Sequence, residues 1–305
     1  LRLTGLEHRF ADGVLLGQDR LLQEVAPADR PDLGAVVASL CRYGITGVTD
    51  TTPGNTAADL WCMRTPAVRV RAMAPPEEPE VPGVTLPTLK VVLREEDADV
   101  EDLAARIEKA HAAGWSVAVH AVTRVETVAT VAAFAQAGST TGDRIEHPSV
   151  LPAETVPVVA ELGLTVVTHP DFVARRGDVY LADVDPVDRD SLYRLRTALD
   201  AGVSLGAGSD APVGDLDPWS AMQAAVTRTG PDGSVLGPAE RLSPEQALGL
   251  FLGPAEHPGG PARAVRPGAI ADLCLLRAPW AAARRRLNAD PVRATIVGGA
   301  VVWEA

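Results

Sequence analysis

Residues 116–120, SVAVH, form a short apolar run that ends in a histidine, His120. Three other apolar runs carry a polar residue suited to metal binding or acid–base chemistry: Lys90 in TLKVVL (88–93), His147 in DRIEHPSV (143–150) and Asp210 in SLGAGSDAPV (204–213). The steps between these four residues, in chain order, are 30, 27 and 63 residues. A barrel in which each strand and its helix use about 30 residues would give this spacing, with one strand skipped in the last interval. The spacing therefore predicts four side chains that converge at the ends of neighbouring parallel strands.

The chain alternates short β-rich runs with alanine-rich helical ones, as repeated βα units do. Helical stretches such as VEDLAARIEKAHAAG and VETVATVAAFAQAG end in Ala-Gly shortly before the next strand, and a glycine stop before a buried strand is typical of parallel βα units. The predicted strands cover residues 44–50, 67–73, 88–93, 116–120, 144–147, 164–169 and 203–210. We therefore expect an α/β fold of the (β/α)8 TIM-barrel class, with seven of its eight strands visible.

Residues 1–43 contain a helical segment and no convincing buried strand, so the first barrel strand is expected to lie upstream of Leu1. An open seven-stranded sheet and a barrel closed by another element are the alternatives. The Pro/Gly-rich stretch GPAEHPGGPARAVRPG marks the end of the barrel. The predicted parts are a helical segment before the second strand (1–43), a TIM barrel (44–255) and a C-terminal β segment of a small sandwich domain (256–305).

The composition excludes several classes of protein. The net charge of −12 argues against binding to nucleic acid or to an anionic membrane. No apolar run reaches the roughly 18 residues that a membrane span needs, and no leader pattern precedes the first polar segment, so a cytoplasmic location is expected. Three scattered cysteines without a CxxC pair favour reduced thiols over disulfides or a thiolate metal site.

Lysine is rare in this chain, and the position of one lysine is informative. Only Lys90 and Lys109 occur among the 28 basic residues. Lys109 belongs to a charged helical stretch, whereas Lys90 lies within an apolar strand, where an ammonium group is costly unless it is paired or chemically altered. A buried ion pair and a Schiff-base lysine are two interpretations of this position.

In these residues the chain resembles the amidohydrolase superfamily of metal-dependent hydrolases, specifically its amidohydrolase-3 type. The resemblance rests on Lys90, on His120, on His147 within RIEHPSVL and on Asp210 within GAGSDAPV. The tail RPGAIADLCLL followed by RATIVGGAVVW is similar to the C-terminal half of the family's small β-sandwich. The resemblance covers nearly the whole chain.

The resemblance implies hydrolysis of a C–N bond, in an amide or cyclic amide other than a peptide, by water bound to one or two divalent metal ions, usually zinc. The implied metal ligands are Lys90 as a carbamate, His120, His147 and Asp210. Asp210 would also take the proton from the water, and His169 in VVTHP would orient the substrate or stabilise the oxyanion.

Residues expected to bind the small-molecule substrate are Arg144, which could instead pair with Glu146, and Arg175, Arg176 and Tyr180 in the charged connection 171–190. Loops at the carboxyl ends of barrel strands commonly determine substrate specificity. A solvated loop is the alternative interpretation for this connection.

The chain departs from the family at its N-terminus. The family takes two metal ligands from a His-x-His pair in the first strand, whereas no two of the six histidines here lie two residues apart, and His8 has no partner. One alternative hypothesis is therefore a catalytically impaired barrel that binds a ligand or partner. A second is a lyase that uses Lys90 in a Schiff base, and a homo-oligomer is a further expectation because apolar surface near the N-terminus invites pairing.

Overall fold

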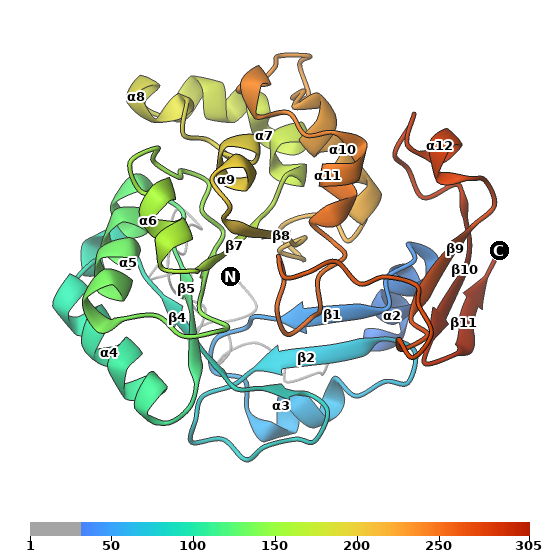
Figure 1. Cartoon of the computed structure of the whole chain (residues 1–305), viewed down its shortest axis with the longest axis horizontal. Coiled ribbons are helices and arrows are strands. Elements are labelled where there is room, and N and C mark those ends of the chain that lie inside the picture. The colour runs from blue at the N-terminus through green and yellow to red at the C-terminus, as the bar shows by residue number, and fades with distance from the viewer. Residues whose placement is uncertain (1–31) are drawn as a thin grey trace, which may run out of the picture. The chain divides into compact units, whose positions relative to one another are not determined.

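The computed structural model describes residues 32–305, of which residues 37–305 form one compact unit. Two parallel sheets carry the predicted strands. The first contains β1 (Gly47–Asp50), β2 (Arg69–Met73) and β3 (Thr85–Leu86), and the second contains β4 (Thr88–Val92), β5 (Ser116–His120), β6 (Arg144–Glu146), β7 (Thr165–Thr168) and β8 (Ser204–Ala207). Within each sheet every strand pairs with the next one along the chain, which is the order expected of repeated βα units (Figure 1).

Pro87 separates the two sheets. It stands between β3, which pairs with β2, and β4, which pairs with β5. Proline has no backbone N–H to donate to a ladder, but its carbonyl still accepts a hydrogen bond of 3.1 Å from the backbone of Ser116. One extended stretch therefore continues from the first sheet into the second, and the predicted seven-strand order is preserved.

The β4–β8 sheet has an outer face covered by helices and an inner face toward the barrel axis. Val91, Val119, Ile145 and Val166, in register with one another, point outward and share one buried cluster with helix residues such as Phe134. The covering helices are α4 (Val100–Ala112), α5 (Arg124–Ala137) and α6 (Val156–Glu161). Because side chains alternate along a strand, the neighbouring residues point inward, and these include Lys90, Ala118, Arg144 and Thr165 in one row.

A proline- and glycine-rich segment, residues 254–260, lies between β8 and β1 (Figure 1). A Cβ atom added at Gly206 of β8 would lie 2.8 Å from the Cβ of Pro258, and one added at Gly47 of β1 would lie 3.9 Å from that of Ala255. The Thr49 hydroxyl of β1 also donates to the Ala255 carbonyl. No hydrogen-bonded ladder joins β8 to β1 among the described residues, and this segment occupies the space between them.

The charged connection 171–190 is largely helical, whereas the sequence favoured a loop. Helix α7 (Asp171–Asp183) follows β7 directly and is followed by α8 (Pro186–Arg189). The other helical elements are α2 (Leu33–Arg42), α3 (Ala57–Cys62), α9 (Arg196–Asp200), α10 (Pro218–Thr227), α11 (Pro244–Gly249) and α12 (Trp280–Ala283), with short 3-10 turns η1 (Glu95–Asp97) and η2 (Pro238–Glu240).

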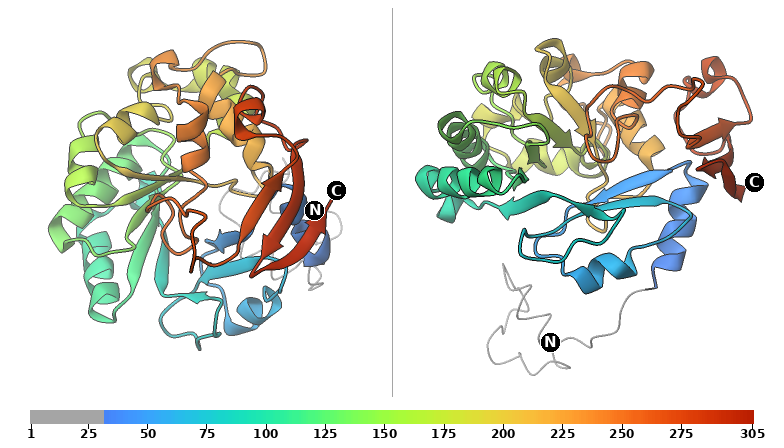
Figure 2. Two further views of the ribbon diagram at one scale, coloured as in Figure 1. Left: turned by 45° about the vertical axis from the view of Figure 1, so that its right-hand side comes forward. Right: turned by 60° about the horizontal axis from the view of Figure 1, so that its bottom comes forward.

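The C-terminal strands form a separate antiparallel sheet in the order β11-β10-β9 (Figure 2). Its members are β9 (Leu273–Leu276), β10 (Val292–Val297) and β11 (Ala300–Glu304). Val302 and Trp303 pack with Leu40 and Val68, and the Thr295 hydroxyl donates to the Cys41 carbonyl at 2.5 Å. The small sheet is thus packed against α2 and the segment that leads into β2.

The expectation of a helical segment over 1–43 falls mostly outside the described residues, as does His8. Within the described part, α2 accounts for its last turns. Among residues 32–305, no helix has the length and apolar character needed to cross a membrane.

Candidate metal centre

Five side chains meet at the carboxyl-terminal side of the β4–β8 sheet. Lys90 lies within β4, His120 ends β5, His147 directly follows β6, His169 directly follows β7, and Asp210 follows β8 after a two-residue turn. The four residues predicted from the spacing of the apolar runs are therefore brought to one place, together with His169.

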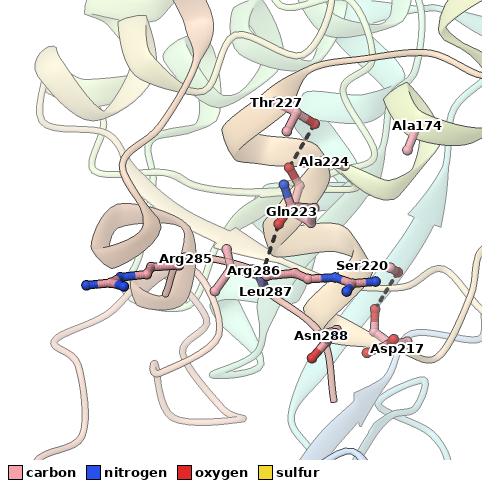
Figure 3. A pocket seen from close by; sticks show the side chains of 10 residues that line it. All are labelled: Ala174, Asp217, Ser220, Gln223, Ala224, Thr227, Arg285, Arg286, Leu287 and Asn288. Carbon is pink, nitrogen blue, oxygen red and sulfur yellow. Dashed lines mark hydrogen bonds between the residues drawn. The ribbon is translucent and has the colours of Figure 1, made fainter. Parts of the chain in front are cut away.

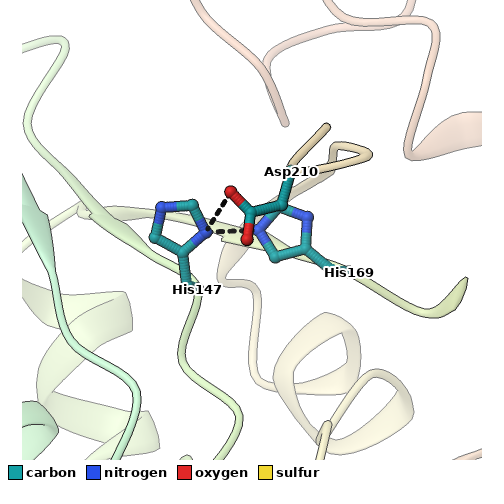
Figure 4. Close-up of side chains that lie close together, drawn as sticks. All are labelled: His147, His169 and Asp210. Carbon is teal, nitrogen blue, oxygen red and sulfur yellow. Dashed lines mark hydrogen bonds and ion pairs between the residues drawn. The ribbon is translucent and has the colours of Figure 1, made fainter. Parts of the chain in front are cut away.

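Three of these side chains point their ligand atoms at one another (Figure 4). His147 Nδ1 lies 2.7 Å from His169 Nε2 and 3.6 Å from Asp210 Oδ1. All three ligand atoms lie within 4.8 Å of one another. In the part of the chain that the structure describes, the cluster of side chains that could hold a metal ion consists of His147, His169 and Asp210.

Lys90 and His120 lie against the same histidine from the other side. Lys90 Nζ is 3.2 Å from His147 Nε2, and the His120 ring centroid is 4.8 Å from that of His147. The geometry thus favours a different division of roles between His120 and His169 from the one predicted from the sequence. His169 stands among the candidate metal ligands, where a role toward substrate was expected, and His120 stands beside them.

The hydrogen bonds fix the tautomers of both central histidines. His169 Nδ1 lies 2.9 Å from the Gly208 carbonyl, which can only accept, so Nδ1 carries the proton and Nε2 has the free lone pair. His147 Nδ1 must then donate to His169 Nε2, and His147 Nε2 accepts from Lys90. Both imidazoles are neutral in this chain of hydrogen bonds.

Burial accounts for the protonation states of the cluster. His147 and His169 are 8 % and 3 % exposed, and this burial holds the pKa of each imidazole well below its ordinary value. Burial also lowers the pKa of Lys90; the Glu146 carboxylate opposes this effect and the Arg144 guanidinium adds to it. Neutral imidazole is the form that binds a metal ion, and a neutral amine is the form that can react with CO₂.

Two of the three candidate ligands have a left-handed backbone conformation, which residues other than glycine rarely adopt. His147 has φ of 69° and Asp210 has φ of 52°. Such left-handed conformations cost on the order of 1 kcal/mol each and concentrate at functional sites. At both positions the side chain points toward the shared centre (Figure 4).

The donor set fits a zinc-like ion. Two imidazole nitrogens and a carboxylate oxygen are ordinary zinc ligands, and metal–ligand distances of about 2.0–2.1 Å place tetrahedral ligand atoms roughly 3.4 Å apart. The 3.6 Å separation of His147 Nδ1 and Asp210 Oδ1 agrees with that value. The 2.7 Å contact between the histidines carries a proton that metal binding would remove, so this distance must lengthen when an ion is held.

Asp50 is a carboxylate at this end of the barrel that the sequence prediction missed. It ends β1 and accepts hydrogen bonds from the Thr52 backbone at 3.0 Å and from Asn55 Nδ2 at 2.8 Å. Its negative charge acts on Lys90. The run GVTD has the same pattern as the other sites, an apolar strand that ends in a polar residue, and that pattern could have identified it.

Arg144 does not occupy the position expected of a substrate contact. Its side chain is 2 % exposed and lies inside the barrel, below the strand ends, with Nε 3.4 Å from Glu146 Oε1. At this depth the side chain is almost without solvent contact. The supporting pair with Glu146, which was the second interpretation, is the arrangement present.

The other three predicted substrate contacts lie on α7. Arg175 pairs loosely with Asp171 at 3.9 Å. Arg176 stacks over the Phe172 ring at 5.6 Å, and that ring is in turn 5.6 Å from the ring of His169. Tyr180 accepts a hydrogen bond of 2.9 Å from the Tyr193 hydroxyl. Arg176 is thus linked to the candidate centre through one aromatic ring.

A cavity of about 500 Å³ lies elsewhere on the molecule (Figure 3). Ser220 and Gln223 of α10 line it together with Arg286 from the segment after α12, and Gln223 accepts a hydrogen bond from the Leu287 backbone at 3.1 Å. None of the five clustered side chains contributes to it. The cavity is therefore separate from the candidate metal centre.

Curated proteins resemble the chain over about two thirds of its length. It is 28 % identical over 216 residues to an N-substituted formamide deformylase from Arthrobacter pascens, an alignment that covers 68 % of this chain and 39 % of the relative. The chain thus spans well under half the length of that curated relative.

Solved structures share the fold at low sequence identity. An uncharacterised metal-dependent hydrolase from Pyrococcus furiosus superposes with a TM-score of 0.59 at 22 % identity, over 80 % of this chain and 56 % of the other. A variant of the atrazine chlorohydrolase from Arthrobacter aurescens TC1, in complex with zinc and atraton, gives a TM-score of 0.59 at 19 % identity, over 88 % and 72 %.

These likenesses confirm the expected α/β fold of the TIM-barrel class, although hydrogen-bonded ladders do not close the barrel in the described residues. A family profile described as "Amidohydrolase family" matches residues 4–303, nearly the whole chain. This chain belongs to the amidohydrolase family.

Proposed function

We propose that this protein is a metal-dependent hydrolase that cleaves a C–N bond other than a peptide bond. The observation that carries the proposal is the convergence of His147, His169 and Asp210 within 4.8 Å, with left-handed backbone at two of the three. A bound zinc or similar divalent ion would lower the pKa of a water molecule toward neutrality and polarise the scissile carbonyl.

The residues of this chain would then divide the remaining tasks. Asp210 is the most exposed of the three side chains, at 32 %, so its second carboxylate oxygen can reach a solvent-side water and take its proton. Asp210 would return that proton to the leaving nitrogen. His147 and His169 are held in fixed orientations by Lys90 and by the Gly208 carbonyl, which keeps the ligand atoms in place.

Lys90 has a further role in this proposal. Its neutral amine adds to CO₂ and loses a proton, which gives a carbamate whose oxygens can bind a metal ion. This reaction also removes a costly buried ammonium. Burial of Lys90 at 9 % exposure and its 3.2 Å contact with His147 support this role.

The substrate is proposed to be a small amide that enters between α7 and the strand ends, with Arg176 and Tyr180, and more remotely Arg175, as contacts. The likeness to an N-substituted formamide deformylase suggests N-substituted formamides as the first class to test. Release of formate and of the free amine would be measured for the zinc-loaded protein.

The experiment that tests the proposal combines metal analysis with activity. We expect the protein, stripped with a chelator and reloaded with zinc, to retain about one equivalent or more after gel filtration, and we expect Asp210→Asn to abolish hydrolysis. A protein that holds only a small fraction of an equivalent would contradict the proposal. Arg241→Gln, in an exposed arginine that lies outside this cluster, serves as the control variant.

A barrel that binds a ligand without turnover is the second candidate. The separate cavity of about 500 Å³ beside α10 is the observation that motivates it. Zinc binding without hydrolysis of any amide tested, together with ligand binding that survives Asp210→Asn, would support this function. A Schiff-base reaction at Lys90 would instead show as borohydride trapping of a carbonyl substrate.

Self-association is a further proposal. Val265 and Ile270, in the stretch before β9, are 86 % and 68 % exposed, and Val301 of β11 is 59 % exposed. A contiguous apolar patch built from such residues would be a candidate contact surface. Light scattering during gel filtration would give the mass, and a purely monomeric species would contradict this expectation.

A further inference from the structure

Four polar side-chain atoms inside the barrel have neither solvent contact nor a hydrogen-bond partner. They are Arg144 Nε and Nη2, Glu146 Oε1 and Thr165 Oγ1. The three residues are only 1–2 % exposed. Buried polar atoms without partners cost about 1–3 kcal/mol each, and in folded proteins such groups are usually joined by ordered water.

The strand register places these three residues close together on the inner face of the sheet. Arg144 of β6 pairs with Thr165 of β7, so both side chains lie at the same level on the inner face. Glu146 is the next inward-pointing residue along β6, one level nearer to the candidate metal centre. The outward residues between them, Ile145 and Val166, belong to the core beneath the helices.

The donors and acceptors among the unpartnered atoms could all be hydrogen-bonded by a single water molecule. The Arg144 guanidinium can only donate, the Glu146 carboxylate can only accept, and the Thr165 hydroxyl can do both. A water molecule can accept from Arg144 and donate to Glu146 and Thr165. The direct Arg144–Glu146 contact, at 3.4 Å, is an ion pair without a hydrogen bond, so the N–H groups and the carboxylate oxygen keep unused hydrogen-bonding capacity.

Lys90 lies in the same row as this group. It pairs with Ala118, which pairs with Arg144, so a single small side chain separates Lys90 from the guanidinium. A buried lysine near a buried carboxylate would normally form an ion pair with it. Lys90 instead contacts His147 and makes no ion pair with Glu146.

We propose that Arg144, Glu146 and Thr165 hold an ordered water molecule beneath the metal centre, and that Arg144, by pairing with Glu146, leaves Lys90 free to face His147. Arg144 and Thr165 are positioning residues in this arrangement, since neither contacts the reacting atoms. The water site stands independently, whereas the role toward Lys90 rests on the proposed function.

The water site is tested by a high-resolution crystal structure of the chain and of Thr165→Val, Thr165→Ser and Thr130→Val. We expect one ordered water within hydrogen-bond distance of Arg144 and Thr165, absent in Thr165→Val and present in Thr165→Ser. Thr130 on α5 also has a buried, unpartnered hydroxyl, so Thr130→Val is the matched control and should keep the water. Absence of the water from the unaltered protein would overturn the proposal.

The positioning role is tested by zinc affinity, measured by competition with a chromogenic chelator, and by the ¹³C carbamate signal after loading with labelled bicarbonate. In Arg144→Met, Lys90 should turn to the unpaired Glu146, and zinc affinity should fall about 10- to 100-fold with loss of the carbamate signal. The double variant Arg144→Met/Glu146→Gln removes the competing charge and should recover both. Equal loss in the single and double variants would overturn the role.

Misfolding of Arg144→Met and a failure of the protein to bind zinc can each be told apart from failure of the proposal. If Arg144→Met does not fold, the double variant, which buries no unpaired charge, still decides, because normal zinc affinity there supports the role and weakened affinity contradicts it. If the unaltered protein binds no zinc, the proposed function fails, whereas the crystallographic test of the water site is unaffected.

Discussion

His147 Nδ1 lies 2.7 Å from His169 Nε2, and the hydrogen bond between them continues from Lys90 to the Gly208 carbonyl. The continuous chain of donors and acceptors means that neither histidine has a lone pair exposed to solvent in the metal-free state. A metal ion bound to His147 Nδ1 would shift the proton of this ring to Nε2, where the neutral Lys90 amine can accept it. Because both imidazoles are already neutral, their coordination to a metal ion should release no proton.

The first prediction concerns which histidine holds the metal. His169→Ala should lower zinc affinity by at least 100-fold, because it removes one of three donor atoms. His120→Ala should lower it less, since His120 stands beside the group of three and contacts it only through the ring of His147. Equilibrium competition with a chelator measures both, and equal effects would contradict the separation of roles.

The second prediction concerns Asp210 as ligand and proton acceptor. Asp210→Asn keeps the size of the side chain but removes its charge and its basicity, so the rate should fall at least 10³-fold on any substrate found. Zinc should bind more weakly and still be detectable at high concentration. Activity close to that of the unaltered protein at saturating zinc would show that another group takes the proton.

The third prediction is a pH dependence of folding stability in the metal-free protein. The pKa values of His147 and His169 are lowered in the folded state. Below about pH 6.5 both imidazoles therefore become protonated in the unfolded chain and stay neutral in the folded chain. Stability should be full above this pH and decrease below it by up to about 1.4 kcal/mol per pH unit for each histidine. Urea unfolding at several pH values measures the slope, and His147→Gln should reduce it; an unchanged slope would exclude His147 as a source.

The fourth prediction concerns Arg228, a fully buried residue that supports the fold away from the site. Its guanidinium donates to the carbonyls of Leu236, Tyr193 and Leu192 at 2.6, 2.9 and 3.0 Å. Arg228→Met should reduce the free energy of unfolding by about 3–5 kcal/mol, because three buried carbonyls lose their donors. Arg241→Met, which removes an exposed arginine with one backbone hydrogen bond, should cost less than about 1 kcal/mol; similar losses would contradict this view of Arg228.

The strand order and the convergence of the site could be predicted from the sequence because both follow from periodicity. Apolar runs about 30 residues apart determine where strands fall, and the polar residue at each end is carried to the same side. The seven predicted strands are all present, and Lys90, His120, His147 and Asp210 lie together. The additional short strand β3 was missed because Pro87 interrupts the run from which it comes.

Other features depend on contacts that periodicity does not encode. Helix α7 was expected to be a loop, because arginines, aspartates and Gly177 obscure its apolar residues. The segment 254–260 was recognised as a boundary, but its place between β8 and β1 depends on the close approach of Gly206 to Pro258. The placement of His169 among the candidate ligands depends on its contacts with the Gly208 carbonyl and with His147, which lie far from it in the sequence.

The left-handed backbone at His147 and Asp210 has a consequence for protein engineering. Glycine or asparagine at either position would relieve local strain, so a selection for thermal stability alone would favour changes that dismantle the centre. Libraries built to stabilise this barrel should therefore hold both positions constant. Conversely, if stabilising substitutions were found repeatedly at these two positions, that result would indicate, without any substrate, that the strained backbone is kept for ligand binding.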